Sequence, residues 1–183
     1  MQDLAHVTAA ILAGGLGTRL RPVVSDRPKV LAMVQDRPFL TFLLDQLATA
    51  GLRSVVVCSG YLGEQLRTVM GETYSTLRLE YSQEPSPLGT AGALSLALPL
   101  FKSNVVLVMN GDSYCEVGLR DLWSWHNTHK ARATLVLTRV EDTGRDGRVQ
   151  VTDNGAITRF AEKGDNSAPG WINAGIYLIG LSG

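Results

Sequence analysis

The stretch VTAAILAGGLGTRL, residues 7–20, joins a short apolar run to a turn that has three glycines within four positions. The apolar run is typical of a buried β-strand. Glycine at this density costs backbone entropy, so a folded chain needs a reason to keep it. Two interpretations are open. The stretch is either a sharp strand-to-helix turn or a loop whose backbone N–H groups approach an anion closely.

Short apolar runs alternate with amphipathic runs from this point to about residue 130. The strand-like runs are residues 7–13, 54–59, 77–83 and 104–110, and the helix-like runs are 38–51, 61–71, 89–101 and 118–130. Runs that are nearly continuous in Val and Leu are typical of strands covered on both faces. The alternation predicts parallel strands joined by helical crossovers.

The pattern changes after about residue 133. Residues 133–141 and 172–179 are expected to be strands, and RVQVTDNGAITRFAE (148–162) between them contains two alternating runs. Asp153-Asn154-Gly155 separates these runs, and Asn-Gly favours a tight primed turn. The sequence therefore predicts a β-hairpin here.

The charge balance, the length of the apolar runs and the cysteine content argue against several classes of protein. Among 183 residues, 17 basic side chains balance 17 acidic ones, which argues against a nucleic-acid or anionic-membrane partner. No apolar run reaches the roughly 18 residues of a membrane span, and the start lacks the basic leader of a signal peptide. Cys58 and Cys115 lie far apart and are expected to be reduced, buried thiols. We expect a single-domain cytoplasmic protein.

Three charged residues follow strand-like runs. Arg19 follows the glycine turn and offers a planar, always charged fork for phosphate, and Lys29 adds a second cation. Asp112 follows the run 104–110, and α/β sheets bind ligands at the carboxyl ends of their strands. Mg²⁺ favours one or two carboxylates together with phosphate oxygens. A turn cap is the alternative role for Asp112, but the neighbouring phosphate loop favours the metal.

Other polar and small residues have simpler interpretations beside the functional ones. Gly89 and Thr90 open a helix that could admit a flat ring or an anion, or Thr90 could merely cap it. For Asn173, ordinary polarity at a strand end competes with binding of sugar hydroxyls. His126 and His129 lie three residues apart on an expected helix, where a solvated face is favoured over a metal pair.

In order and spacing, six motifs resemble those of the sugar-1-phosphate nucleotidylyltransferase family. They are LAGGLGTRL (12–20), RPKV (27–30), EPSPLGTAGAL (84–94), NGDS (110–113), FAEK (160–163) and INAGIY (172–177). Together with RPFL (37–40), they are most similar to heptose-1-phosphate and mannose-1-phosphate guanylyltransferases. The resemblance implies an α/β, three-layer Rossmann-like fold with a mostly parallel mixed sheet. A small β-hairpin insertion would lie in the sugar-binding half.

The resemblance also implies a role for each matching position. The implied catalytic residues are Arg19, Lys29 and Asp112, with Mg²⁺ on Asp112. The implied nucleotide contacts are Gly14, Gly15, Gly17, Thr18, Gln83, Glu84, Gly89 and Thr90. The implied sugar-phosphate contacts are Gly147, Glu162, Lys163, Asn173 and Gly175. Residues 1–115 would form the nucleotide-binding half of the domain, and residues 116–183 the sugar-phosphate half.

The implied reaction is attack of a sugar 1-phosphate oxygen on the α-phosphorus of a nucleoside triphosphate, with GTP favoured. The products are a nucleoside diphosphate sugar and pyrophosphate. The attacking phosphate is already anionic at pH 7, so no strong general base is needed. Alignment and charge neutralisation would then supply the catalysis.

Departures from the family leave alternatives open. Asp146-Gly147 stands where the family has Tyr-Gly, and Gly164 stands where it has Pro. The sequence ends before the family's second metal-binding aspartate, in a segment resembling D-I-G-T-P, so we expect a truncated C-terminus. The alternatives are a non-catalytic regulatory relative that binds a nucleotide or sugar nucleotide, and an enzyme that uses dTTP, UTP or CTP. The apolar last strand could also pair in a homo-oligomer.

Overall fold

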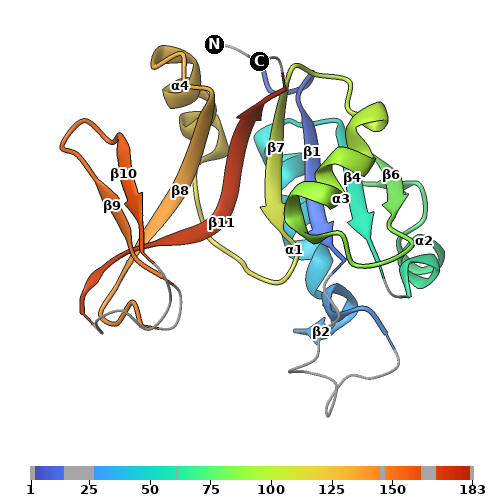
Figure 1. Ribbon diagram of the computed structural model, residues 1–183. Coiled ribbons are helices and arrows are strands. Elements are labelled where there is room, and N and C mark those ends of the chain that lie inside the picture. Colours follow the sequence, from blue (N-terminus) through green and yellow to red (C-terminus); the bar gives the residue numbers. More distant parts are fainter. Residues whose placement is uncertain (1–2, 15–26, 61, 145–146, 162–167, 182–183) are drawn as a thin grey trace.

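A mixed sheet forms the centre of the computed structural model, which describes residues 3–14, 27–60, 62–144, 147–161 and 168–181 (Figure 1). Four neighbouring parallel strands make up its middle, in the order β7 (Val105–Asn110), β1 (Thr8–Ala13), β4 (Ser54–Ser59) and β6 (Leu77–Gln83). The short strand β5 (Thr73–Tyr74) lies antiparallel beside β6. The predicted parallel arrangement is therefore confirmed.

Helices cover both faces of the parallel strands and give the fold three layers. The helices α1 (Phe39–Ala50), α2 (Gly63–Met70) and α4 (Leu119–Thr128) pack on one face, and α3 (Gly89–Ala97) with the short helix η2 (Leu98–Leu100) packs on the other. On β1, Ile11 lies in the first core and Ala10 in the second, and both are fully buried. Burial on both faces explains the continuous apolar runs. No helix in the described ranges is long and apolar enough to cross a membrane.

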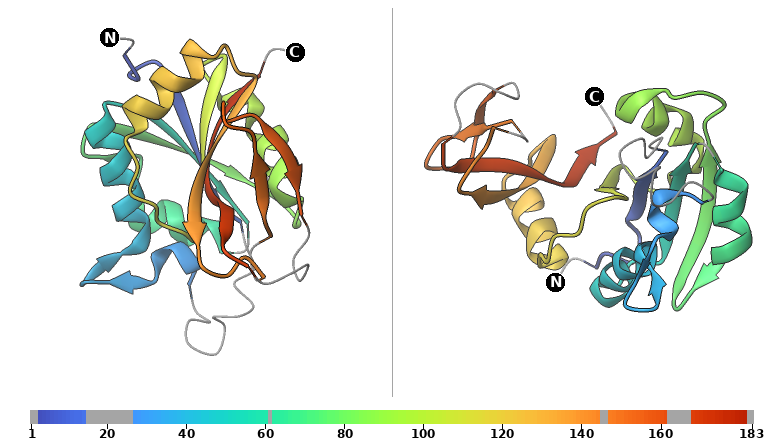
Figure 2. Two further views of the ribbon diagram at one scale, coloured as in Figure 1. Left: turned by 90° about the vertical axis from the view of Figure 1, so that its left-hand side faces the viewer. Right: turned by 90° about the horizontal axis from the view of Figure 1, so that it is seen from below.

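The long strand β11 (Gly170–Gly180) connects the parallel strands to an antiparallel group. Its C-terminal part pairs with β7, and β8 (Ala133–Val140) pairs along its other side. The register along β8 shifts between Asn173 and Tyr177, and Gly175 in this bulge has a φ of +79°. Before the bulge, β11 pairs with β9 (Val149–Val151), which pairs with β10 (Ile157–Phe160). Seen from below, β11 links the two groups of strands (Figure 2).

The turns of the two hairpins differ from expectation. The type I′ turn that Asn-Gly favours needs a positive φ at both central residues. Between β9 and β10 only Gly155 has one, so the prediction of a primed turn there is wrong. The primed φ signs occur instead in an unpredicted hairpin, β2 (Met33–Val34) and β3 (Arg37–Pro38), where Gln35 and Asp36 have φ values of 48° and 60°. The absence of glycine from that turn explains why it was missed.

The two histidines of α4 do not share a solvated face. His126 is buried, with 4% of its surface exposed, and its Nδ1 lies 2.8 Å from Thr134 Oγ1. His129 is exposed, and its Nδ1 lies 2.9 Å from the carbonyl oxygen of Trp125. The expected solvated face is therefore wrong for His126. Its burial lowers the pKa of its imidazole.

Candidate functional site

The carboxyl ends of the four parallel strands meet at one edge of the sheet, which is the lower edge in Figure 1. The strand order places Asp112, Gly14, Gly60 and Glu84 along this edge, each just after the end of its strand. Ligands of open α/β sheets bind at this edge, because the loops leaving the strands converge there. This edge of the sheet is therefore the candidate ligand-binding site.

Lys29 and Asp112 form an ion pair at this edge. Lys29 begins the short helix η1 (Lys29–Leu31), which buries Val30 and Leu31 in the core. Its Nζ lies 3.0 Å from Asp112 Oδ2, and the two side chains remain 34% and 55% exposed. The structure thus brings together two of the three residues predicted to be catalytic. Arg19, the third, lies outside the described residues, as do Gly15, Gly17 and Thr18.

A hollow of about 570 Å³ opens at the ends of β1, β4 and β6. Its lining is Gly14, Gly60, Leu62, Gln83, Glu84 and Pro85–Pro87. Glu84 Oε2 accepts a hydrogen bond of 3.0 Å from the N–H of Leu88. The backbone N–H of Glu84 donates to the carbonyl oxygen of Ser59 at 2.9 Å. These bonds hold the Glu84 carboxylate at the side of the hollow.

Two glycines allow the Glu84 carboxylate to lie against the backbone. A Cβ on Gly14 would overlap Glu84 Oε1, and a Cβ on Gly60 would lie 2.9 Å from the carbonyl oxygen of Gly14. Gly60 was not among the residues predicted for the site. The signal that could have found it is its position directly after a buried strand, which matches the position of Gly14 after β1.

Cys58 is not placed as a nucleophile. Cys58 is buried on β4, and burial raises the pKa of its thiol to about 12, with a smaller contribution from the charge of Glu84. A thiol that stays protonated at neutral pH is a poor nucleophile. Cys115 is free and only half-buried, so the expectation of burial is wrong for it.

The start of α3 follows the loop that lines the hollow. The helix begins at Gly89, and Leu88 occupies the cap position without a side-chain hydrogen bond to the described residues. Thr90 is therefore not the cap, and that alternative is wrong. A Cβ on Gly89 would meet none of the described atoms within 4 Å, so the space beside this helix start is open within the described part of the chain.

The bulge of β11 lies beside the end of β7. Asn173 Oδ1 accepts a hydrogen bond from the Gly175 N–H at 2.9 Å, and Asn173 Nδ2 donates to Tyr177 Oη at 2.7 Å. A Cβ on Gly175 would lie 2.6 Å from Asn110 Nδ2. The bulge thus brings Gly175 against the strand that leads to Asp112. Asn173 acts within the bulge, as its amide bonds to residues of its own strand.

Of the other residues predicted to bind the sugar phosphate, only Gly147 lies within the described part of the chain. Gly147 lies in the loop before β9, with a φ of +77°, and its N–H donates to the carbonyl oxygen of Thr143 at 3.2 Å. Glu162 and Lys163 lie outside the described residues. The structure therefore brings Gly175 to the carboxyl edge and leaves Gly147 in the antiparallel group.

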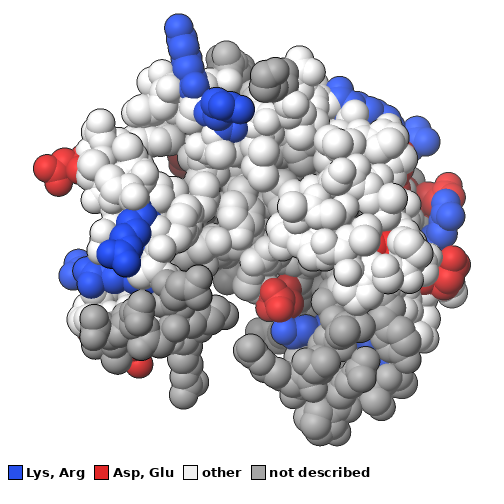
Figure 3. Space-filling model, in the orientation of Figure 1, with Lys and Arg blue, Asp and Glu red and all other residues white. Residues whose placement is uncertain are grey.

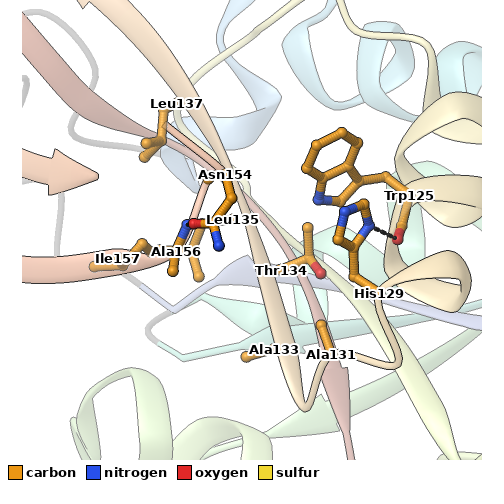
Figure 4. Close-up of a pocket in the computed structure, with 11 residues that line it drawn as sticks. Trp125, His129, Ala131, Ala133, Thr134, Leu135, Leu137, Asn154, Ala156 and Ile157 are labelled. Carbon is orange, nitrogen blue, oxygen red and sulfur yellow. Dashed lines mark hydrogen bonds between the residues drawn. The ribbon is translucent and has the colours of Figure 1, made fainter. Parts of the chain in front are cut away.

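Two other hollows are lined by none of the residues predicted for the site. One, of about 340 Å³, lies over β8 (Figure 4). The stacked rings of Trp125 and His129 stand on one side of it, and Asn154 and Ile157 on the other. The second, of about 610 Å³, lies between α1 and residues 114–121. The site formed by Lys29, Asp112 and Glu84 is separate from both.

Charge and donor groups limit what this site can hold. On the face shown in Figure 3, the basic side chains of the described residues lie apart from one another and form no broad basic surface. Within the described ranges, no group of three or more His, Cys, Asp or Glu side chains could hold a metal ion. Asp112 is an exposed single carboxylate, so it fits Mg²⁺ only when substrate phosphate oxygens complete the coordination.

Comparison with known proteins gives a family for the whole described fold. The model of the nucleotidyl transferase family matches residues 8–179. The chain is 38% identical over 170 residues to the D-glycero-alpha-D-manno-heptose 1-phosphate guanylyltransferase of Aneurinibacillus thermoaerophilus, covering 93% of this chain and 73% of that protein. It is 37% identical over 178 residues to the mannose-1-phosphate guanylyltransferase catalytic subunit beta of Drosophila melanogaster, covering 95% of this chain and 48% of that protein. The chain thus spans about three quarters of the first relative and about half of the second.

A solved structure has the same fold. The crystal structure of HddC from Yersinia pseudotuberculosis complexed with GMP-PN superposes with a TM-score of 0.82 at 28% identity. The superposition covers 96% of this chain and 77% of that one. This similarity confirms the predicted α/β fold with a mostly parallel mixed sheet.

Proposed function

The chain belongs to the nucleotidyl transferase family, and from this premise we propose that it transfers a nucleotidyl group to a sugar 1-phosphate. The donor is GTP, and the acceptor is a heptose or mannose 1-phosphate. The observation that carries the proposal is the Lys29–Asp112 pair at the carboxyl edge, one strand away from the Glu84 hollow. In the proposed division of the domain, residues 1–115 bind the nucleotide and residues 116–183 bind the sugar phosphate.

In the proposed reaction, an oxygen of the sugar 1-phosphate forms a bond to the α-phosphorus of the nucleotide. The bond from that phosphorus to the leaving pyrophosphate breaks, and its electron pair stays on the pyrophosphate. Lys29 neutralises charge on the α-phosphate and pyrophosphate, together with Arg19 from the glycine-rich loop that includes Gly15, Gly17 and Thr18. Asp112 would hold Mg²⁺, which would supply further charge neutralisation and alignment when bound.

The Glu84 carboxylate supports guanine as the base. Guanine presents two adjacent donors, N1–H and the 2-amino group, and a carboxylate is an acceptor for both. Thymine and uracil present only one ring N–H at that edge. Gln83 lines the same hollow and is available for a second contact, while Gly89 and Thr90 leave the start of α3 open to the nucleotide.

Heptose or mannose is the proposed sugar because the similar proteins named above act on these sugar phosphates. Gly175 forms the wall of the sugar site next to Asp112, and Asn173 holds that wall in shape. The proposed contacts from the remainder of this half are Gly147, Glu162 and Lys163.

The test is release of pyrophosphate from GTP in the presence of Mg²⁺ and either mannose 1-phosphate or heptose 1-phosphate. We expect release with at least one of these acceptors and none when the acceptor is omitted. Binding of GTP without release for any pair of triphosphate and sugar phosphate would instead support a non-catalytic regulatory relative.

Thermal shift with the four ribonucleoside triphosphates and dTTP tests the base separately, since the preferred ligand raises the melting temperature most. We expect GTP to give the largest shift and Glu84→Gln to reduce that shift more than the shift given by UTP. A larger shift with dTTP, UTP or CTP would replace guanine by that base and leave the transfer reaction intact.

A further inference from the structure

Lys29 stands at one end of a small closed segment. The N–H of Ala32 donates to the carbonyl oxygen of Lys29 at 3.0 Å, and the N–H of Phe39 donates to that of Ala32 at 2.9 Å. The β2–β3 hairpin lies between these bonds, and both residues of its turn, Gln35 and Asp36, have a left-handed φ. Non-glycine residues keep such strained conformations only where surrounding contacts fix them. We therefore expect side-chain contacts from neighbouring elements to fix the conformation of this hairpin.

The contacts that hold it come from α1 and β5. The Arg37 guanidinium lies 2.6 Å from Asp45 Oδ2 and 3.8 Å from the centre of the Phe42 ring. The second oxygen of Asp45 accepts a hydrogen bond from Tyr74 Oη at 2.8 Å. Asp45 thus ties β3, α1 and β5 together through one carboxylate. We call Arg37, Phe42, Asp45 and Tyr74 the hairpin clamp.

The clamp has a route to Lys29 through the backbone. Val30 and Leu31, directly after Lys29, are buried in the same core as Leu40 and Leu43 of α1. A long lysine side chain loses rotamer freedom when it is held in one geometry, and an exposed ion pair such as Lys29–Asp112 contributes little to hold it. The position of Nζ therefore depends on how firmly the backbone at residue 29 is fixed.

We propose that the hairpin clamp positions Lys29 for the substrate phosphates, with Asp45 as its central residue. The described contacts of Asp45 are to Arg37 and Tyr74 and not to Lys29, so the proposed role is that of a positioning residue. Its effect on turnover rests on the function proposed above, whereas its effect on the Lys29 segment does not. The Arg67–Glu72 pair, at 3.3 Å and with side chains 60% and 76% exposed, lies on α2 and the turn after it, away from the Lys29 segment, and provides a matched control.

The first arm of the test needs no activity. Hydrogen exchange is measured at the amides of Leu31, Ala32 and Phe39 in Asp45→Asn and in Glu72→Gln. Acylation of Lys29 is measured by mass spectrometry relative to the exposed Lys130. Asp45→Asn should speed exchange and acylation by about fivefold, since it loosens one local unit, and Glu72→Gln should change neither. Unchanged rates in Asp45→Asn would overturn the proposal.

The second arm uses turnover. Asp45→Asn should lower kcat by about fivefold with little change in the KM for GTP, and Asp45→Glu should restore most of the loss. In a Lys29→Ala background, Asp45→Asn should cause no further loss. Faster exchange combined with unchanged kcat in an active protein would overturn the positioning role. If the unmodified chain shows no turnover, the function proposal fails, and exchange and acylation alone decide whether the clamp positions Lys29.

Discussion

The parallel and antiparallel parts of the sheet hold their residues in different ways. In the parallel part, β1, β4 and β7 are buried on both faces, and the site residues follow the ends of these strands. In the antiparallel part, β8 and β10 are half-buried or exposed. Side-chain bonds such as those of Asn173, and glycines with positive φ such as Gly147 and Gly175, shape this part instead.

The difference teaches that the two parts should respond to mutation differently. A site built on buried parallel strands can lose a charged side chain and keep its framework, because the backbone ladder supports it. The bulge of β11 depends on the Asn173 amide and on Gly175, so a change at either residue should disturb the backbone itself. Mutations in the parallel part should therefore affect chemistry more than folding, and mutations in the antiparallel part should do the reverse.

The largest effect should come from Asp112→Asn at the edge of the parallel part. It removes the partner of Lys29 and the proposed metal ligand, so kcat in the pyrophosphate-release assay should fall by at least about 100-fold. The melting temperature should change little, because an exposed ion pair contributes about 1 kcal/mol or less. Asp153→Asn in the β9–β10 turn is the control. Equal losses of activity and stability would remove the contrast between the two parts.

The next largest effect should come from Gly175→Ala in the bulge. The new Cβ would lie 2.6 Å from Asn110 Nδ2, on a residue whose φ is +79°. We expect the free energy of unfolding, measured in urea, to fall by about 2–3 kcal/mol. Gly51→Ala is the control, because Gly51 has a left-handed backbone with a φ of +99° and the nearest described atom to its new Cβ would be Arg120 Nη2 at an ordinary 3.6 Å, so it should cost only about 1 kcal/mol. Equal costs at the two positions would show that the contact with Asn110 does not matter.

A smaller, pH-dependent effect should come from His126, which joins α4 to the antiparallel part. Burial lowers the pKa of its imidazole below the usual 6.5, so the unfolded chain binds the proton more readily than the folded chain. The stability contributed by the buried, neutral His126 is therefore present above pH 6.5 and is lost as the pH falls below that value. Urea midpoints at pH 7.5 and 5.0 should differ more for the unmodified chain than for His126→Gln. The same difference in both chains would assign the pH dependence to other groups.

The smallest effects should distinguish the two hairpin turns. Asp36→Gly relieves a left-handed φ in the β2–β3 turn and should raise the free energy of unfolding by about 0.5 kcal/mol, after the entropy that glycine gains in the unfolded chain. Asp153→Gly, where φ is not positive, should lower it by about the same amount. Thermal unfolding of both variants measures the difference. A loss of stability in Asp36→Gly would mean that its left-handed φ carries no strain.

The same contrast explains how much could be predicted from sequence. The strands of the parallel part were predicted closely, because strands buried on both faces leave continuous apolar runs such as residues 54–59. The position of Asp112 at the carboxyl edge followed from the same pattern. The ion pair between Lys29 and Asp112, 83 positions apart, was not predicted, because local patterns carry no information on such distances.

Features that depend on particular contacts could not be predicted. The β2–β3 hairpin has no glycine in its turn and is held by Asp45, eight positions from Arg37. The Asn-Gly pair correctly indicated a hairpin, but the type of its turn depends on the backbone at Asn154. The sugar contact of Asn173 stays a prediction, but the bonds that its amide makes within the bulge depend on the register shift in β11, which the sequence pattern did not indicate.

The packing of Gly14 and Gly60 against Glu84 restricts how this pocket can diverge during evolution. A side chain at Gly60 would press on the backbone of Gly14, whereas a side chain at Gly14 would displace only the carboxylate end of Glu84, so Gly60 is the more restricted of the two positions. Variation is left to position 84 itself and to the loop Pro85–Pro87, which lines the open side. A descendant that prefers another base would therefore be expected to differ in these few neighbouring codons, while Gly60 persists and Gly14 is free to change only together with position 84.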